Sequence, residues 1–373
     1  MTLAPASPQL DPAVLASAAS DLGTSSITFL VGDETLTYRA AHGDLSSDNQ
    51  PDGDTVVRLS PQAWADLTGQ VRSFINLFLT QELTFERGGF EQLSDWYPAL
   101  TYLHAGIPPY DPRRADLKGR DPGRAMSLDD SDEELRAQLD TMGFMRVRGV
   151  FTHEEMAAAN AEIDRLAALA KPGDDQSWWA KGEDDQDILC RLVYATLRSS
   201  VLQALEQDPR VKRLGTLLDP AAKIAADRME GSPVLLKVPG KTKGLSNIPY
   251  HQDCGMGGHA ILCPSVSVGI QLTGSNAETG NLTVVPGSHG QTLHYNWQQK
   301  LTDVPVVAVD TEPGDVTVHV QDVMHASPKP RGQGGRRTMY VTHYPAALWD
   351  HIGPGQAYND IVRNRTAEVS ALT

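Results

Sequence analysis

The sequence predicts an α+β fold in two domains joined by a linker. Residues 26–104 alternate short β-branched runs with helical stretches, and residues 234–342 hold strand-like runs bounded by Gly and Pro turns. Between these regions, residues 106–130 contain four prolines separated by charged residues, a composition typical of a linker. The expected boundaries are 1–108 for the first domain, 109–130 for the linker and 131–373 for the second domain.

Composition excludes several classes of protein. A net charge of -15 without any basic run argues against nucleic acid as a partner. No apolar run has the length of a membrane span. The N-terminus has neither the basic region nor the apolar stretch of a signal peptide. The cysteines, Cys190, Cys254 and Cys263, are too few for a disulfide framework, and the last two lack zinc-site spacing. We therefore expect small buried thiols and a cytoplasmic location.

In the first domain, prolines prevent a helix in residues 1–12, and strands and helices then alternate. Ser60 followed by Pro61 is a typical helix start, because the hydroxyl caps free N–H groups and proline is tolerated at the first helical position. Residues 42–54 read as a polar loop. The expected strands are 26–30, 35–40, 55–59 and 83–86, and the expected helices are 13–22, one starting at 60, and 90–104 with an interruption at Pro98.

In the second domain, three helices are expected to cover one side of a sheet. Thr152 with Glu155 forms the start signal of the first helix. Trp178 and Trp179 read as part of a polar loop, either at a substrate mouth or in ordinary packing, and 240–244 is a candidate lid. The expected helices are 153–170, 189–205 and 211–229, and the expected strands are 234–238, 315–320 and 337–342. The last two strands are expected to form one hairpin that is flanked by His325 and Arg336.

His251, Asp253 and His325 are the candidate metal ligands. Residues two apart in a strand point to the same side, so His251 and Asp253 can both face the interior of a barrel while Gln252 faces away. Two imidazoles and one carboxylate suit Fe(II) and leave one face of the ion open. The pattern His-x-acid also occurs at 42–44 and 153–155, but neither has strand-like surroundings followed by a distant His and Arg.

From about Leu135 to Tyr344 the chain resembles the phytanoyl-CoA dioxygenase family of Fe(II)/2-oxoglutarate oxygenases. The distal His325 is followed by Ser327 and, eleven residues after the histidine, by Arg336, which is the family's spacing. The other matching features are His251-Gln252-Asp253, the stretch 280–289 ending in Pro-Gly-Ser-His, the Pro-Gly-Asp strand start at 313–315, and the opening segment 142–151.

This resemblance implies a double-stranded β-helix (jelly-roll, cupin-like) barrel with flanking helices. It implies Fe(2+), 2-oxoglutarate as cosubstrate and O2, with ascorbate as the reductant in vitro. His251, Asp253 and His325 would be the catalytic metal ligands, and Arg336 would clamp the distal carboxylate of 2-oxoglutarate with help from Ser327. The reaction implied is hydroxylation of an unactivated C–H bond, with release of succinate and CO2.

Two features depart from the family pattern. Many relatives carry an aromatic residue in the strand where Gly269 stands, which suggests that other residues line the cosubstrate pocket in this protein. Arg337 adjoins Arg336, and a slip of one residue would exchange their faces; the spacing favours Arg336.

The order of elements in residues 26–104 resembles the sterol carrier protein-2-like fold. The residues that carry this resemblance are Thr55–Gly69, Leu83-Thr84-Phe85 and Gly88. It implies a sheet over helices around an apolar tunnel that takes up lipids, and hence a hydrophobic substrate such as a sterol or a fatty acyl group. The alternative is a plain α+β domain used for docking or stability, because an apolar stripe is more often core than tunnel.

Two other functions remain open on the same barrel. One is a non-catalytic, cupin-like binding protein, and the other is a Zn- or Mn-dependent hydrolase or isomerase, which would have no need of a dicarboxylate clamp. Lys237 could reach an acidic group in the site or be solvated on its strand. Five other histidines receive no ligand role: His289 and His294 could support the site or contact substrate, whereas His319, His343 and His351 are expected at the surface or satisfied in the structure.

Overall fold

Two separate hydrophobic cores organise the chain, one in residues 27–100 and one in residues 126–341. They are seen in a computed structural model that describes residues 10–182, 185–238, 242–243, 248–253, 262–293, 298, 303–332 and 334–351. Among these residues, no helix is both long and apolar enough to cross a membrane.

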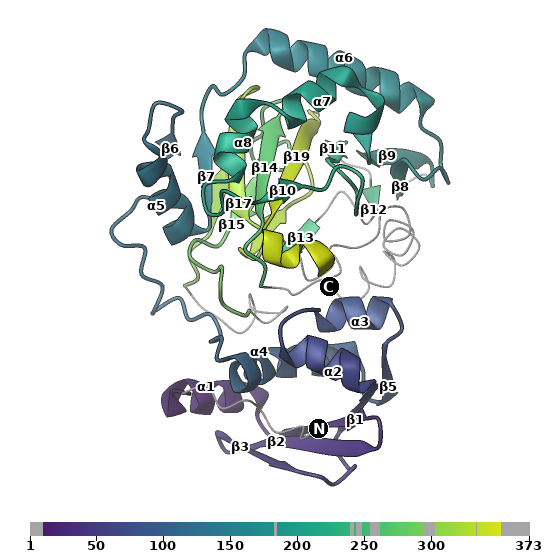
Figure 1. Ribbon diagram of the computed structural model, residues 1–373, viewed down its shortest axis with the longest axis vertical. Helices are drawn as coiled ribbons and strands as arrows, with labels where there is room; N and C mark the ends of the chain where they lie inside the picture. The colour runs from purple at the N-terminus through teal and green to yellow at the C-terminus, as the bar shows by residue number, and fades with distance from the viewer. Residues whose placement is uncertain are drawn as a thin grey trace.

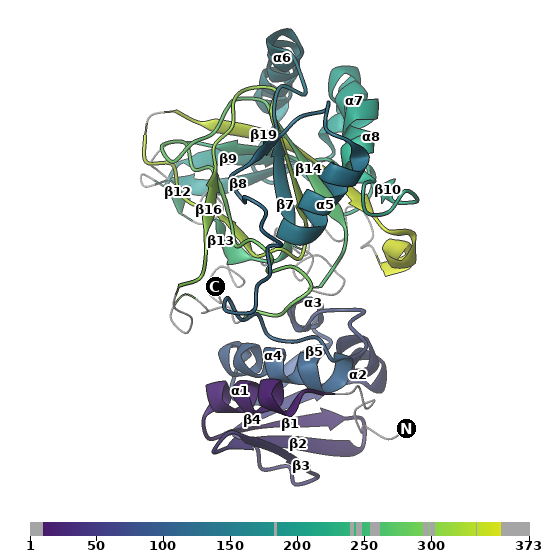
Figure 2. The ribbon, with the colours of Figure 1, turned by 90° about the vertical axis from the view of Figure 1, so that its left-hand side faces the viewer.

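The first core lies between a five-stranded sheet and helices that cover one of its faces (Figure 2). The strand order is β3-β2-β1-β4-β5, and all neighbours are antiparallel except β1 and β4. The strands are β1 (Ser25–Val31), β2 (Glu34–Ala41), β3 (Asp44–Asp48), β4 (Thr55–Leu59) and β5 (Leu83–Arg87). The helices are α1 (Pro12–Leu22), α2 (Pro61–Thr68), α3 (Phe74–Leu79) and α4 (Phe90–Ala105).

Three predictions for this region need correction. Residues 44–48 form strand β3 rather than a loop, because this polar segment pairs with β2 alone at the edge of the sheet. Helix α3 was not predicted, because most of its side chains are buried and the sequence lacks a polar face to mark the period. Helix α4 continues through Pro98 instead of being interrupted there. The start of α2 at Ser60-Pro61 is confirmed.

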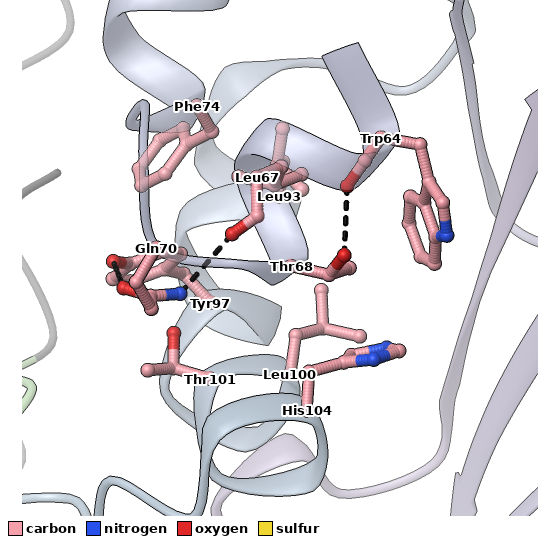
Figure 3. A pocket seen from close by; sticks show the side chains of 10 residues that line it. All are labelled: Trp64, Leu67, Thr68, Gln70, Phe74, Leu93, Tyr97, Leu100, Thr101 and His104. Carbon is pink, nitrogen blue, oxygen red and sulfur yellow. Dashed lines mark hydrogen bonds between the residues drawn. The ribbon is translucent and has the colours of Figure 1, made fainter. Parts of the chain in front are cut away.

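A small cavity lies between α2 and α4 (Figure 3). Its free volume is about 10 Å³, enough for about one water molecule. Ligand pockets for molecules of drug size have volumes of about 300–1,000 Å³. The residues around it are Trp64, Leu67, Thr68, Gln70, Phe74, Leu93, Tyr97, Leu100, Thr101 and His104.

The second core is built on two sheets. The larger has the strand order β12-β8-β9-β11-β19-β14-β17-β7-β6, with β10 paired to β19, and the smaller has the order β13-β18-β15-β16. The large sheet contains β6 (Ala125–Met126), β7 (Phe144–Val147), β8 (Ser177–Gly182), β9 (Asp187–Leu192), β10 (Lys223–Ile224), β11 (Val234–Lys237), β12 (Thr242–Lys243), β14 (Val266–Gln271), β17 (Val316–Val320) and β19 (Arg336–Tyr344). The small sheet contains β13 (Ile248–His251), β15 (Leu282–Val284), β16 (Val307–Val309) and β18 (His325–Ser327).

Helices cover the outer face of the large sheet (Figure 1). They are α5 (Asp132–Met142), α6 (His153–Leu169), α7 (Ser200–Glu206) and α8 (Pro209–Gly215), accompanied by the 3-10 turns η1 (Ala195–Arg198) and η3 (Ala346–His351). The capping box of α6, made by Thr152 and Glu155, is confirmed. The predicted helices 189–205 and 211–229 are wrong in part, because Leu189–Leu192 belongs to β9 and the chain leaves α8 at Thr216.

The tryptophan pair lies in β8 rather than in a loop. Trp178 is buried in a small cluster with Cys190 and Tyr194, and the Arg191 guanidinium stacks over its ring. This is ordinary packing, one of the two alternatives that the sequence left open. The candidate lid 240–244 lies mostly outside the described residues; its backbone is described at Thr242–Lys243, which form β12.

The two sheets face each other across polar side chains. Arg336 of β19 in the large sheet contacts Ser327 of β18 in the small sheet. The predicted hairpin between 315–320 and 337–342 is wrong, because β14 lies between β17 and β19 and pairs with both. His325 is therefore in the sheet opposite Arg336, not on the same hairpin.

Candidate functional site

His251, Asp253 and His325 meet between the sheets. One ligand atom from each lies within 4.8 Å of the others, which makes the three a group that can hold a metal ion. Asp253 Oδ1 lies 3.0 Å from His251 Nε2 and 3.6 Å from His325 Nε2. The strand geometry explains the pairing, because His251 ends β13 directly opposite His325 of β18. Gln252 points away from the triad and donates to the Asp322 carbonyl, as expected for the residue between His251 and Asp253 on an extended segment.

The protonation states suit metal binding. Burial lowers the pKa of His325 to about 3, so its imidazole is neutral at neutral pH. Its Nδ1–H donates to the Val323 carbonyl at 2.9 Å, which leaves the Nε2 lone pair directed toward Asp253. Burial alone would raise the pKa of Asp253, but His325, His251 and His319 outweigh it and hold this pKa well below its usual value. Neutral imidazole and ionised carboxylate are the ligand forms that a divalent ion requires.

His319 is the site residue that the sequence analysis missed. It was expected at the surface or satisfied, but it is buried in β17, and its Nε2 lies 3.3 Å from Asp253 Oδ2. Its ring centroid is 4.7 Å from that of His325. A signal was available: Val316, Val318 and Val320 alternate with Thr317 and His319, so the histidine had to face the other side of the strand from the valines.

Arg336 forms a second polar centre beside the triad. Its side chain is fully buried, and every partner it has among the described residues is a neutral oxygen. Nη1 donates to Ser327 Oγ at 2.9 Å and to the Gly280 carbonyl at 3.1 Å. Nη2 donates to Tyr340 Oη at 2.9 Å, and Nε donates to Thr338 Oγ1 at 2.9 Å.

Arg337 points to the opposite face of β19. Its guanidinium contacts helix α6, 3.2 Å from Asn160 Oδ1 and 2.7 Å from Asp164 Oδ1. The two arginines therefore have the orientations that the spacing favoured, with Arg336 inside and Arg337 outside.

Lys237 adds a second basic group next to Arg336. The two residues are paired across β11 and β19, and the Lys237 side chain is 2% exposed rather than solvated. Its Nζ donates to the Ser327 and Pro328 carbonyls. Burial, followed by the neighbouring Arg336 charge, lowers the pKa of Lys237 to about 6. Two basic side chains thus converge on Ser327, Arg336 at its hydroxyl and Lys237 at its carbonyl, without a carboxylate between them in the described residues.

Gly269 of β14 leaves space for an aromatic residue, Tyr340, from the paired strand β19. A Cβ at Gly269 would lie 2.6 Å from Thr317 Oγ1 and 2.9 Å from a ring carbon of Tyr340. Tyr340 of β19 therefore lies where a side chain on β14 would otherwise extend. The ring whose hydroxyl contacts Arg336 comes from β19, which accounts for the departure seen in the sequence.

Gly269→Ala is expected to lower the free energy of unfolding by about 1–3 kcal/mol, because the methyl group overpacks a site where Thr317 and Tyr340 already touch. Thermal unfolding of the metal-free protein measures the change. The control is Gly89→Ala, where the added Cβ makes only an ordinary contact at 3.5 Å, with an expected loss below about 1 kcal/mol. Equal losses in the two variants would mean that Gly269 is not tightly packed.

The remaining candidates lie away from the triad or outside the described residues. His289 Nε2 contacts the Asp140 carbonyl of α5, and His343 is buried against α8 rather than at the surface. Cys190 and Cys263 are buried, as expected for small core side chains. His294, Cys254 and the side chain of His351 fall outside the part of the chain that the structure describes, as do residues 1–9.

Comparisons with known proteins bear on the fold and the family. EctD from S. alaskensis with bound Fe aligns with a TM-score of 0.50 and 19% identity, over 63% of this chain and 85% of that one. AviO1 from Streptomyces viridochromogenes Tue57 has a TM-score of 0.48 and 20% identity, over 60% and 98% of the two chains. The epimerase SnoN from nogalamycin biosynthesis has a TM-score of 0.47 and 24% identity, over 58% and 83%.

A comparison with curated protein sequences found no match. The model of the family described as phytanoyl-CoA dioxygenase (PhyH) matches residues 139–338, more than half of the 373-residue chain. This match includes strands of both sheets of the second core and the residues His251, Asp253, His319, His325, Ser327 and Arg336, whereas Tyr340 lies just beyond it. The protein therefore belongs to the phytanoyl-CoA dioxygenase family, a family whose cofactors are iron and 2-oxoglutarate.

Proposed function

We propose that the protein is an Fe(II)/2-oxoglutarate-dependent dioxygenase that hydroxylates an unactivated C–H bond of a small molecule, with release of succinate and CO2. The observation that carries the proposal is the environment of Arg336. A fully buried guanidinium with only neutral partners among the described residues is costly unless an anion binds to it. A bound dicarboxylate supplies that anion.

The iron site is assigned to His251, Asp253 and His325. Two neutral imidazoles and one carboxylate fit Fe(II), and all three donor atoms face one another. When bound, the iron supplies the redox chemistry that couples decarboxylation of the 2-oxo acid to oxygen insertion. The protein holds the ligands on paired strands β13 and β18, so the donor atoms are fixed by sheet geometry rather than by a loop alone.

The spacing between the two polar centres fits 2-oxoglutarate. His325 and Ser327 are two apart on β18, so their side chains leave the same face of the strand about 7 Å apart along it. That separation is comparable to the length of a five-carbon diacid, which can reach the metal at one end and Arg336 at the other. Arg336 and Ser327 would bind the distal carboxylate by charge-assisted hydrogen bonds, with the Lys237 ammonium nearby.

Lys237 makes the binding of 2-oxoglutarate pH-dependent. Its pKa of about 6 in the free protein means that the amine is neutral at pH 8. A carboxylate bound nearby favours the charged form, so binding takes up a proton. The affinity should be nearly constant below pH 6 and should fall as the pH rises above it, by at most about tenfold per unit.

Calorimetry at pH 8 in two buffers of different ionisation enthalpy measures this proton uptake, with Mn(II) in place of iron. The matched variant Lys237→Met should bind with no uptake attributable to this amine and with a flatter pH dependence. Equal proton uptake by the wild type and Lys237→Met would contradict the assignment.

Succinate formation tests the reaction class. The purified protein is incubated with Fe(II), O2, ascorbate and 2-oxoglutarate in the presence of a small-molecule library. The proposal expects succinate, together with a product heavier than its substrate by one oxygen atom. Binding of metal and 2-oxoglutarate without turnover of any tested compound would favour a cupin-like binding protein. Substrate conversion with Zn(II) or Mn(II) that consumes no 2-oxoglutarate would favour the hydrolase or isomerase.

A hydrophobic substrate remains a prediction, as does lipid binding by the sterol carrier protein-like region. The cavity between α2 and α4 has the volume of about one water molecule, so lipid uptake would require these helices to separate. A fluorescent fatty acid titrated into the full-length protein tests this. Displacement by sterols or acyl chains supports a lipid-carrier role, and the absence of binding favours docking or stability as the role of residues 1–108.

A further inference from the structure

Asp253 holds its two carboxylate oxygens in different environments. Oδ1 faces His251 and His325, at 3.0 Å and 3.6 Å from their Nε2 atoms. Oδ2 faces His319 Nε2 at 3.3 Å, from the opposite sheet. His319 is not part of the group whose ligand atoms lie within 4.8 Å of one another, so it is a neighbour of the candidate metal ligands rather than one of them.

The polar contacts of His319 point to Asp253 alone among the described residues. The side chain is 1% exposed, and its Nδ1 is buried without a hydrogen-bond partner there. Because ionised Asp253 can only accept, Nε2 must be the donor in this contact. A buried polar atom without a partner destabilises a fold by about 1–3 kcal/mol, so stability alone does not explain an imidazole at this position.

We propose that His319 is a positioning residue that keeps Asp253 a one-oxygen ligand of the iron. This inference rests on the proposed function. A carboxylate can bind a metal through one or both oxygens. With both oxygens bound and two imidazoles, four of six positions would be filled, leaving too few for a chelating 2-oxo acid and O2. The hydrogen bond from His319 orients the carboxylate so that Oδ1 faces the two imidazoles, which supports metal binding, and it occupies Oδ2, which preserves three open positions.

His319 also borders the cosubstrate subsite. Its ring meets Tyr340 edge to face at 6.2 Å between centroids, and the Tyr340 hydroxyl accepts from Arg336. The same imidazole therefore lies between the carboxylate that binds iron and the ring beside the guanidinium. Loss of its hydrogen bond is expected to affect metal binding first, and the geometry of the 2-oxoglutarate complex second.

Three substitutions at one position separate the hydrogen bond from packing. His319→Leu keeps much of the volume and removes the donor. His319→Gln places an amide nitrogen near the position of Nε2, whereas the shorter His319→Asn does not reach it. His343→Leu is the matched control, because His343 is also a buried histidine of the same sheet and packs against α8.

Anaerobic titration with Co(II) or Fe(II), without 2-oxoglutarate, gives the metal affinity independently of activity. We expect His319→Leu and His319→Asn to weaken it by about 10- to 100-fold, and His319→Gln and His343→Leu to stay within a few-fold of wild type. The visible absorption of the Fe(II)·2-oxoglutarate complex should be altered in His319→Leu and His319→Asn and unchanged in His319→Gln and His343→Leu. Thermal unfolding of each metal-free variant identifies any variant that fails to fold. If His319→Leu does not fold, the difference in metal affinity between His319→Gln and His319→Asn tests the role of the hydrogen bond.

Unchanged metal affinity in folded His319→Leu, or in folded His319→Asn if the leucine variant does not fold, would overturn the positioning role. That result leaves the proposed function intact if Asp253→Ala still abolishes binding. If wild type itself binds no metal, or if Asp253→Ala binds as well as wild type, the proposed function fails instead.

Discussion

Asp253→Ala is expected to form no measurable succinate under conditions in which the wild type turns over. The substitution removes the one carboxylate of the candidate metal site and leaves His251 and His325, whose Nε2 atoms both face the vacated position. Loss of groups that merely support a metal ligand typically lowers affinity or activity 10- to 100-fold, so loss of a ligand itself should exceed about 100-fold. Metal titration and succinate release measure the two effects separately.

The chain provides its own control for this experiment. His153 begins the motif His-x-Glu on helix α6, where it is exposed and is not part of the group of His251, Asp253 and His325. His153→Ala should therefore retain wild-type metal affinity and turnover. Succinate formation by Asp253→Ala at the wild-type rate would remove His251, Asp253 and His325 as the iron site.

Arg336→Met should raise the KM for 2-oxoglutarate by about 100-fold or more. The methionine approximates the aliphatic stem of arginine, so the main loss is the guanidinium that donates to Ser327, Tyr340 and the Gly280 carbonyl. Hydrogen bonds to charged groups contribute about 1.5–3 kcal/mol each, and a two-bond clamp therefore corresponds to at least about two orders of magnitude. Steady-state kinetics with varied 2-oxoglutarate, and direct binding in the presence of Mn(II), check the result.

Arg337→Met is the matched control at the neighbouring position. It removes the contacts with Asn160 and Asp164 on α6, and the exposed ion pair contributes at most about 1 kcal/mol. We expect no change in the KM for 2-oxoglutarate. If both variants bind the cosubstrate as wild type does, the clamp is elsewhere, and if only Arg337→Met loses affinity, the two arginines have been assigned to the wrong faces.

Period-two geometry is the part of the site that could be predicted from sequence. Placing His251 and Asp253 on one side of a strand, and Arg336 rather than Arg337 inward, needed only the alternation of side chains. His319 was missed because β17 is buried on both faces, so the usual contrast between apolar and exposed polar positions is absent. Its direction was still readable from the valines that alternate with it.

Strand neighbours were harder to predict than strands. The turn at 332–335 suggested that β17 and β19 form a hairpin, but β14, more than forty residues earlier in the sequence, lies between them. Local turn signals report proximity along the chain, whereas sheet order depends on which faces must be buried. The burial of Lys237 could not be predicted from the sequence either, because it depends on the pairing of β11 with β19.

Because the Arg336 guanidinium has no anionic partner among the described residues, the stability of the folded protein should depend on the concentration of the cosubstrate. An anion that binds the folded chain and not the unfolded one raises the free energy of unfolding as its concentration increases. Protein deprived of the 2-oxo acid would open more often and be degraded faster than loaded protein. Cellular abundance would then follow availability of the metabolite, without any change in gene expression.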